Sequence, residues 1–311
     1  MFSRAVVTGS EGFIGGHLVD RLLDMKISVL GIDDMTSGLK STYNSHIKSD
    51  NYIGKQISIN DNRISQIFKD FRPDVVFHLA AKSGVTRSVL NPTFSDLTNI
   101  NGSVNLLEAS RSSGVKRFIF SSSSSVYGGA SEFPTKELSD LNPKSPYALQ
   151  KLCVEKYCKL FFNEYGLESL SLRYFNVFGP RQRSDLQYSA VIAAFVNSIK
   201  TGKSPAIYGS GEQFRDFTYV GNVVDANLLA ASSVGTLRGQ AVNIGCGHKT
   251  SINELCRIIC DKPAEYFDAR PGDVFGSLAD ISRANSLIGY NPRVSLSDGI
   301  EKTIDWYLSS T

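Results

Sequence analysis

The chain has 311 residues, of which 41% are hydrophobic and 20% charged, and its formal net charge is +3. This profile is typical of a globular enzyme with one large α/β domain or two coupled ones, and not of a disordered or disulfide-rich protein. The near balance of charge, without runs of one sign, gives no reason to expect a nucleic-acid or membrane partner.

The first residues, MFSRAVVTGSEGF, run directly into a predicted strand without a signal-peptide pattern. No apolar stretch approaches the ~20 residues of a membrane span. The five cysteines have no disulfide spacing, which is typical of reduced thiols. Cys256 and Cys260 are one helical turn apart, but no His or Cys cluster completes a metal site. We therefore expect a cytoplasmic protein without a bound metal.

The first half of the chain alternates short β-branched runs with helical periods. In chain order, we expect a strand, a helix and three further strands over Ala5–Thr8, Gly15–Leu23, Ser28–Ile32, Val75–Leu79 and Phe118–Ser121. A helix is also expected over Thr93–Ser112, with an apolar stripe formed by Leu97, Ile100, Val104 and Leu107. Strands that are apolar on both faces and alternate with helices predict a doubly wound parallel (Rossmann) sheet, with its ligand at the carboxyl ends of the strands.

The pattern becomes irregular after residue 172, with loops, short helices and isolated strand-like pieces. This change predicts a smaller C-terminal α/β region. We assign residues 1–172 to the Rossmann domain, with 220–245 returning to it, and residues 173–219 and 246–311 to the smaller region.

Three glycines, Gly9, Gly12 and Gly15, lie between the first predicted strand and the first helix, in the segment TGSEGFIG. Glycines there permit a tight turn, and the helix N-terminus offers free N–H groups to a pyrophosphate. Asp33 ends the second strand, where a carboxylate binds a ribose diol and repels a 2′-phosphate. Together these features predict a dinucleotide site that prefers NAD to NADP. The simpler interpretation is a structural glycine turn beside a surface Asp.

Ser123, Tyr147 and Lys151 form the candidate catalytic group. Tyr147 and Lys151 are four residues apart in SPYALQK and therefore share a helix face. A lysine ammonium beside a phenol is expected to lower the pKa of the phenol, which makes Tyr147 a general base, while Ser123 hydrogen-bonds the reacting oxygen. A Tyr–Lys pair alone is common on helix surfaces, and it is the combination with the glycine turn and the serine that indicates a site.

The chain resembles the extended short-chain dehydrogenase/reductase family, and within it the NAD-dependent UDP-hexose 4-epimerase branch and the UDP-N-acetylglucosamine 4-epimerases. The resemblance covers essentially the whole length and includes TGSEGFIG, GIDDMTSG, HLAA, SSSSSVYG, SPYALQK, RYFNVFGPRQ, AIYGSGEQFRDFTYV, NIG and RPGDV. It implies that NAD takes a hydride from C4 of a UDP-sugar while Tyr147 takes the proton, and that the hydride returns to the other face of the 4-keto sugar.

The resemblance implies two sets of contacts. For NAD these are Gly9, Gly12, Phe13, Ile14, Gly15, Asp33, Asp34, Ser37, Gly38, Ser58, Ile59, Leu79, Ala80, Ala81, Lys82, Asn99, Ser121, Tyr147, Lys151 and Tyr174. For the UDP-sugar they are Lys82, Ser123, Ser124, Ser125, Asn176, Val191, Tyr208, Arg215, Arg270, Asp273 and Ser277. The chain departs from the family at Ser58, where relatives often have Asp and where Asp61 is an alternative contact, and at Lys82, which replaces a frequent Gln.

The resemblance also separates the branches of the family. Related dehydratases carry acidic residues after the catalytic Ser or Thr, whereas this chain has Ser124 and Ser125, which favours epimerisation. At the gatekeeper position, a bulky tyrosine would restrict the pocket to plain hexoses. Ser277 stands there instead and favours UDP-GlcNAc and UDP-GalNAc, with UDP-Glc and UDP-Gal also possible. A UDP-hexuronic acid is the main rival, because Arg87 or Arg181 could face its carboxylate.

Two further classes stay open at this point: a nucleotide-sugar dehydrogenase or reductase with the same catalytic group, and a non-catalytic NAD-binding protein. The family resemblance also implies a homodimer, formed through helices over Thr93–Ser112 and Ser145–Phe162, although their apolar stripes could equally belong to the core of the monomer.

Overall fold

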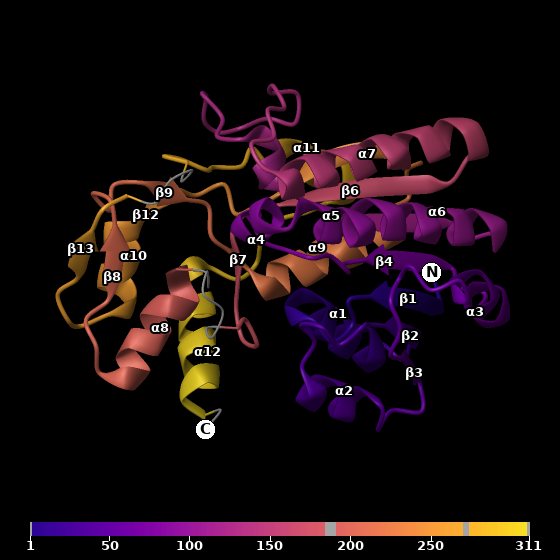
Figure 1. Cartoon of the computed structure of the whole chain (residues 1–311), viewed down its shortest axis with the longest axis horizontal. Coiled ribbons are helices and arrows are strands. Elements are labelled where there is room, and N and C mark those ends of the chain that lie inside the picture. The colour runs from indigo at the N-terminus through magenta and orange to yellow at the C-terminus, as the bar shows by residue number, and fades with distance from the viewer. Residues whose placement is uncertain (1, 184–190, 270–273, 310–311) are drawn as a thin grey trace.

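Seven parallel strands form the central sheet of the computed structural model, which describes residues 2–183, 191–269 and 274–309 (Figure 1). Their order across the sheet is β11 (Arg238–Ile244), β6 (Glu168–Tyr174), β5 (Arg117–Ser123), β4 (Val75–His78), β1 (Arg4–Thr8), β2 (Ser28–Ile32) and β3 (Tyr52–Lys55). The strand order reverses at β1, as in a doubly wound fold, so the predicted fold class is confirmed.

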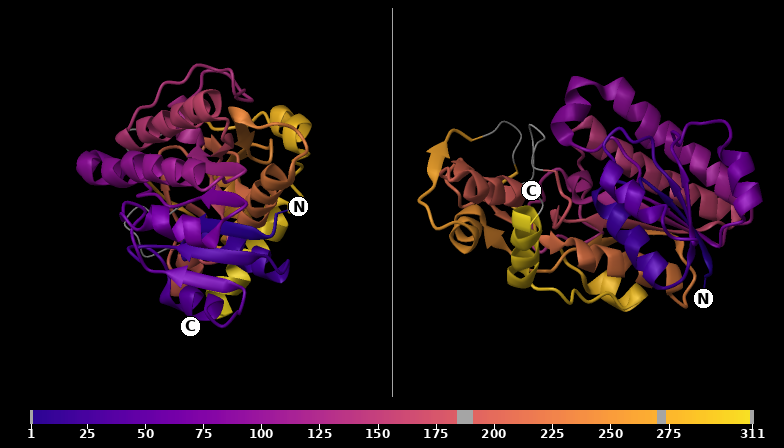
Figure 2. Two further views of the ribbon diagram at one scale, coloured as in Figure 1. Left: turned by 90° about the vertical axis from the view of Figure 1, so that its right-hand side faces the viewer. Right: turned by 90° about the horizontal axis from the view of Figure 1, so that it is seen from below.

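Helices cover both faces of this sheet (Figures 1 and 2). One face packs against α1 (Phe13–Asp24), α9 (Val220–Ser232) and α11 (Ser282–Ile288), and the other against α3 (Ile64–Phe71), α6 (Ser103–Ser112) and α7 (Pro146–Tyr165). The strands are buried on both faces because they alternate side chains between two apolar clusters: Val7 belongs to one and Val6 to the other. Two cores therefore hold the sheet rigid, and with it the ends of its strands. We call this sheet and its helices the Rossmann lobe.

Shorter elements lie at the carboxyl edge of the sheet and around it. These are α2 (Lys40–His46), α4 (Val85–Leu90), α5 (Pro92–Asp96), the π-helical turn η1 (Leu97–Gly102) and the 3₁₀ turn η2 (Ser124–Tyr127).

A second, smaller lobe is built around its own apolar cluster (Figure 1). It contains α8 (Val191–Thr201), α10 (Ile252–Ile259) and α12 (Leu296–Ser309), with the strand pairs β7 (Val177–Phe178) and β10 (Thr218–Tyr219), β9 (Phe214–Arg215) and β12 (Thr250–Ser251), and β8 (Ala206–Tyr208) and β13 (Glu265–Phe267). Each pair is only two or three residues long, so the described residues of this lobe form no extended sheet.

The helix expected over Thr93–Ser112 differs from the prediction. It consists of α5, the π-helical turn η1 and α6 in succession. The wider π turn rotates the residues within it relative to α6. Leu97 is consequently 54% exposed while Leu107 is fully buried, so the predicted single apolar stripe was wrong at Leu97. The same turn directs Asn99 into the interior.

Among the described residues, no helix is both long and apolar enough to cross a bilayer.

Candidate active site

The candidate residues of the Rossmann lobe gather at the carboxyl ends of neighbouring strands. The glycine turn follows β1, Asp33 follows β2, Leu79 follows β4, Ser123 ends β5 and Tyr174 ends β6. These five strands are parallel and lie next to one another, with β3 and β11 outside them at the two edges of the sheet. Their carboxyl ends therefore form one continuous rim. Residues spread over more than 160 positions of the sequence thus meet at one edge, where ligands of this fold bind.

The glycine turn has the close backbone packing that a dinucleotide requires. A Cβ atom on Gly15 would lie 1.9 Å from the Gly9 carbonyl oxygen, and one on Gly9, which has a φ of +70°, would lie 2.8 Å from the Ala80 nitrogen. Gly12 is the N-cap of α1 and offers no side chain to the first N–H groups of the helix. These N–H groups, on Phe13 and Ile14, have no partner within the helix and so fit a pyrophosphate.

Asp33 lies directly beside this turn. Its carboxylate accepts hydrogen bonds from the backbone N–H groups of Glu11, at 3.0 Å, and Met35, at 2.8 Å. Burial raises the pKa of Asp33, and these two donors oppose that rise by favouring the ionised form. The carboxylate is held in one orientation with lone pairs to spare, which fits a ribose diol. Gly38 packs within van der Waals reach of Asp33 and Glu11, and Ser37 precedes it in the same loop.

The predicted contacts on the adenine side lie in the loop after β3. Ile59 is buried against Gly102, while Ser58 is half-buried and accepts a hydrogen bond from the Asn60 N–H at 3.2 Å. Asp61, the suggested alternative to Ser58, makes two side-chain hydrogen bonds with Arg63, at 2.8 and 2.6 Å. The Asp61 carboxylate is thus paired within its own loop.

Ser123, Tyr147 and Lys151 come together where β5 meets α7. The Ser123 hydroxyl lies close enough to the Tyr147 hydroxyl to lower the pKa of Tyr147. Lys151 is buried, and its ammonium donates to the Ser121 carbonyl at 2.6 Å. The backbone N–H of Tyr147 donates to Ser88 at 3.1 Å, which fixes the start of α7. The structure therefore brings the three predicted catalytic residues into one group.

The pKa of Tyr147 differs from the sequence prediction. Burial raises it to about 12, and the nearby Ser123 hydroxyl only partly offsets that rise. The Lys151 ammonium is directed at a carbonyl and lies 5.7 Å from the centre of the Tyr147 ring. Burial also lowers the pKa of Lys151 to about 7. The expectation that Lys151 would bring the pKa of Tyr147 towards neutrality was therefore wrong for the protein's own groups, because burial affects both side chains more strongly.

A buried ion pair behind the catalytic group was missed at the sequence level. The Glu155 carboxylate, one helical turn beyond Lys151, accepts hydrogen bonds from Arg173 at 2.9 and 2.7 Å and from Ser122 at 2.5 Å. Lys151 and Glu155 thus tie α7 to consecutive residues of β5, immediately before Ser123. The available signal was the spacing Tyr-x₃-Lys-x₃-Glu, which places all three side chains along one helix face.

Tyr174 and the serine run complete this part of the rim. The Tyr174 hydroxyl accepts a hydrogen bond from Asn227 of α9 at 2.8 Å. Ser124 and Ser125 begin the turn η2, and the Ser125 backbone N–H donates to Ser123 at 3.2 Å. The Ser125 hydroxyl is buried and has no hydrogen-bond partner among the described residues. A buried hydroxyl next to Ser123 that lacks a partner fits a ligand that supplies one.

Five of the predicted substrate contacts lie in the second lobe or at its edge: Asn176, Val191, Tyr208, Arg215 and Ser277. Asn176 donates to the Asp216 carbonyl at 3.2 Å and to the Ser277 hydroxyl at 3.4 Å, so these segments adjoin. Arg215 donates to the Phe214 and Phe275 carbonyls, at 2.9 and 3.3 Å. The Tyr208 ring packs against Phe267, with 5.6 Å between centroids.

Val191 begins α8 and is half-buried. Arg270 and Asp273 lie outside the described residues.

The two arginines suggested for a substrate carboxylate lie in different settings. Arg181 donates to Asp20 of α1 at 2.6 Å. One guanidinium nitrogen is therefore paired with a carboxylate of the Rossmann lobe, while the other, Nη1, is buried without a hydrogen-bond partner among the described residues. Arg87 is exposed on α4.

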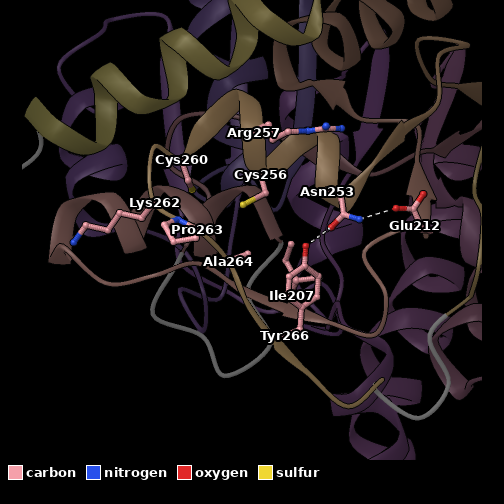
Figure 3. Close-up of a pocket in the computed structure, with 10 residues that line it drawn as sticks. All are labelled: Ile207, Glu212, Asn253, Cys256, Arg257, Cys260, Lys262, Pro263, Ala264 and Tyr266. Carbon is pink, nitrogen blue, oxygen red and sulfur yellow. Dashed lines mark hydrogen bonds between the residues drawn. The ribbon is translucent and has the colours of Figure 1, made fainter.

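A hollow of about 330 Å³ in the second lobe is separate from this site (Figure 3). Ile207, Asn253, Cys256 and Tyr266 are among the residues that line it, and none of the predicted contacts is. Burial raises the pKa of Cys260, also at this hollow, to about 12, and all five cysteines are free. Within the described part of the chain, no three His, Cys, Asp or Glu side chains are grouped as a metal site would require.

Comparison with known proteins agrees with this geometry. The model of the NAD dependent epimerase/dehydratase family matches residues 5–245. The UDP-glucose 4-epimerase of Mycolicibacterium smegmatis is 38% identical, over 98% of each chain.

Among solved structures, the UDP-N-acetylglucosamine 4-epimerase of Methanobrevibacter ruminantium M1, in complex with UDP-N-acetylmuramic acid, is 41% identical with a TM-score of 0.94 over 99% of each chain. The UDP-glucuronic acid 4-epimerase of Bacillus cereus, in complex with UDP-glucuronic acid and NAD, is 31% identical with a TM-score of 0.91, over 99% of this chain and 100% of that one. The family predicted from the motifs is confirmed: the chain belongs to the NAD dependent epimerase/dehydratase family, and its cofactor is NAD.

Proposed function

We propose that the chain epimerises a UDP-sugar at C4 through a transient 4-keto sugar, and that Ser123, Tyr147 and Lys151 carry the reaction. The observation that carries this proposal is the grouping of Ser123, Tyr147 and Lys151 where β5 meets α7, at the rim that also holds the glycine turn. The similar proteins named as 4-epimerases of UDP-glucose, UDP-N-acetylglucosamine and UDP-glucuronic acid support the reaction type.

Each residue has a defined task in this proposal. Tyr147 accepts the proton of the sugar 4-hydroxyl and later returns it, while the Ser123 hydroxyl orients the same oxygen. Lys151 contributes a positive charge at the buried end of the pair. When bound, NAD⁺ supplies a hydride acceptor whose ring is cationic. A cation near a buried phenol favours the phenolate, and so opposes the burial that holds the pKa of Tyr147 at about 12.

The residues beside Ser123 distinguish this function from dehydration, another reaction of the family. Elimination of water needs an acid–base group next to the catalytic serine, and the residues at that place are Ser124 and Ser125. Hydroxyls can donate and accept hydrogen bonds to a sugar but cannot act as carboxylates do. The unpartnered Ser125 hydroxyl supports a role for this run in holding the substrate.

Ser277 supports a preference for UDP-GlcNAc and UDP-GalNAc. It is half-buried, and its hydroxyl accepts a hydrogen bond from Asn176 at 3.4 Å. A small side chain at this position leaves room for the acetamido group at C2 of the sugar, which a tyrosine would fill. Plain hexoses would fit the same space. The hexuronic acid alternative depends on Arg87, on Arg181, which also binds Asp20, and on the hydroxyl groups of the serine run as further donors.

A homodimer is part of this proposal. Leu90, Phe94 and Leu97 are exposed on the segment from α4 to η1, and Leu149 and Leu160 are exposed on α7. The two segments are in contact within the monomer, so these side chains belong to neighbouring surfaces. Apolar side chains gathered in this way are typical of an interface between subunits.

The direct test is a chromatographic assay of purified enzyme with UDP-GlcNAc, UDP-Glc and UDP-GlcA, each without added NADH. We expect the C4 epimer to form, fastest from UDP-GlcNAc. The Tyr147→Phe variant should lose at least about 10²-fold in rate, the lower range for removal of a general base. Tyr157→Phe, on the same helix but outside the group, is the matched control. Net accumulation of NADH or of a 4-keto product by the wild type would contradict the proposal.

A further inference from the structure

Lys82, in the loop after β4, is unusual in being a buried lysine whose backbone is fixed by a side chain. The Lys82 N–H donates to the Asn99 side-chain oxygen at 2.8 Å, and the Asn99 amide donates to the Lys82 carbonyl at 3.1 Å. The same amide also donates to Gln150, next to Lys151 on α7, at 2.8 Å. The base of Lys82 is therefore rigid and is tied to the helix that carries Tyr147.

The side chain of Lys82 ends in an ion pair with the loop after β2. Its ammonium lies 2.7 Å from the Asp34 carboxylate and 2.8 Å from the Thr36 hydroxyl. Thr36 also donates its backbone N–H to Asp34 at 2.9 Å, so the three groups form one closed cluster. Burial alone would raise the pKa of Asp34, but the hydrogen bonds from Lys82 and Thr36 outweigh it and lower the pKa. The Asp34 carboxylate is thus stabilised in its ionised form.

The strand order explains which two loops this ion pair connects. In the sheet, β1 lies between β4 and β2, so the loops that carry Lys82 and Asp34 are two strand spacings apart, about 10 Å. The glycine turn lies between them and touches both: the Gly9 backbone packs on Ala80, and the Glu11 carbonyl accepts a hydrogen bond from the Leu39 N–H at 3.0 Å. The ion pair therefore bridges the two loops that flank the glycine turn.

We propose that the Lys82–Asp34 ion pair is a strap across the dinucleotide groove, and that it keeps NAD bound throughout catalysis. The inference depends on the proposed epimerase reaction. In that reaction C4 of the sugar loses a hydride and its 4-hydroxyl a proton, and both must return to the same sugar. If NADH left at this stage, the two electrons would leave with it and the 4-keto sugar could not be reduced. A redox-neutral enzyme therefore benefits from slow release of its cofactor.

Dissociation of NAD from the purified holoenzyme is the readout that tests the strap. Released NAD is trapped by excess alcohol dehydrogenase and ethanol, and the NADH formed is followed by its absorbance. Lys82→Met keeps the length of the side chain but removes the charge, and we expect it to release NAD about 10-fold faster, as the loss of a charge-assisted hydrogen bond implies. Lys116→Met is the matched control, because it breaks an exposed ion pair, with Asp74, at the opposite end of the strands.

A double-mutant cycle separates a strap from a direct contact between Lys82 and NAD. Asp34→Asn keeps the hydrogen bond from Thr36 but loses the charge, and should release NAD as fast as Lys82→Met does. If the two residues act as a pair, the double variant should be no faster than either single variant. Effects that multiply, or an unchanged rate in Lys82→Met, would overturn the strap. A wild-type enzyme that retains NAD but forms no epimer would refute the epimerase proposal. The rates of NAD release from the variants would still decide whether the ion pair acts as a strap.

Discussion

The two lobes position their residues by different means. In the Rossmann lobe, the candidate residues follow strands of one seven-stranded sheet whose faces are both covered by apolar clusters. In the second lobe, Tyr208 and Arg215 lie on strand pairs of two or three residues, and Ser277 lies in a loop. The sheet of the Rossmann lobe restricts the backbone at each candidate residue. In the second lobe, one side chain can change with little effect on its neighbours. We therefore expect substitutions in the Rossmann lobe to abolish cofactor binding and those in the second lobe to alter substrate choice.

The largest effect is expected for Gly15→Ala. Its Cβ would lie 1.9 Å from the Gly9 carbonyl oxygen, so the turn between β1 and α1 must open. We expect the purified variant to contain no NAD and to have no activity, as measured by enzymatic cycling of NAD released on denaturation. Gly235→Ala is the control, because a Cβ there meets nothing within 4 Å. A Gly15→Ala enzyme that retained one NAD per chain would show that the turn is not the dinucleotide site.

Ser277→Tyr tests the expectation that substitutions in the second lobe alter substrate choice. We expect this variant to keep its NAD and its activity on UDP-Glc, but to lose about 10- to 200-fold in kcat/KM for UDP-GlcNAc, the range that pocket sterics provide. The measurement is the ratio of kcat/KM for the two sugars. An unchanged ratio would remove Ser277 from the account of sugar choice.

A buried histidine connects the two lobes and makes stability depend on pH. His46, 2% exposed, contacts Glu11 of the glycine turn at 3.2 Å and Asp20 at 3.0 Å, and Asp20 in turn binds Arg181 at 2.6 Å. Burial lowers the pKa of His46, but the two carboxylates outweigh this and raise it to about 8. Since this exceeds the unfolded value of 6.5, the contribution is complete below pH 6.5 and is lost as the pH rises through 8.

That shift corresponds to about 2 kcal/mol. The stability contributed by His46 should therefore fall by about this amount between pH 6 and pH 9, so the difference in free energy of unfolding between the wild type and His46→Gln should shrink by about 2 kcal/mol over that interval. His248→Gln, at an exposed position, serves as the control. A difference between the wild type and His46→Gln that stays the same over this interval would contradict the assigned ion pairs.

The smallest effect concerns Glu155, whose carboxylate raises the pKa of Lys151 against the lowering by burial. In Glu155→Gln, the pKa of Lys151 should fall further. We expect the high-pH limb of the kcat/KM profile to move to lower pH by about one unit, roughly 1.4 kcal/mol. Glu164→Gln, exposed on the same helix, should leave the profile unchanged. Loss of thermal stability without movement of that limb would indicate that Glu155 has only a structural role.

The features that could be predicted from sequence are those set by residues close together in the chain. The glycine turn, Asp33 and the Tyr147–Lys151 pair depend on residues close in sequence, and the family and fold class inferred from such motifs were confirmed. The strand Ser28–Ile32 was predicted with its observed bounds. Such features follow from short spacings that only one kind of element satisfies.

Long-range packing explains what could not be predicted. The π-helical turn at Leu97–Gly102 has no signature in the periodicity of a single chain, so the exposure of Leu97 was missed. Arg181 could be placed beside Asp20 only once α1 was in position, 161 residues earlier in the chain. The pKa of Tyr147 depends on burial by distant segments, which no Tyr–Lys spacing reports.

The most direct test of the central claim is the fate of the hydrogen at C4. The enzyme is incubated with a UDP-sugar carrying deuterium at that carbon, and the isolated epimer is examined by NMR. The account predicts that the epimer retains deuterium at C4, in solvent water and without release of NADH, because the same hydride leaves and returns. Loss of deuterium to solvent, or its recovery in free NADH, would contradict it.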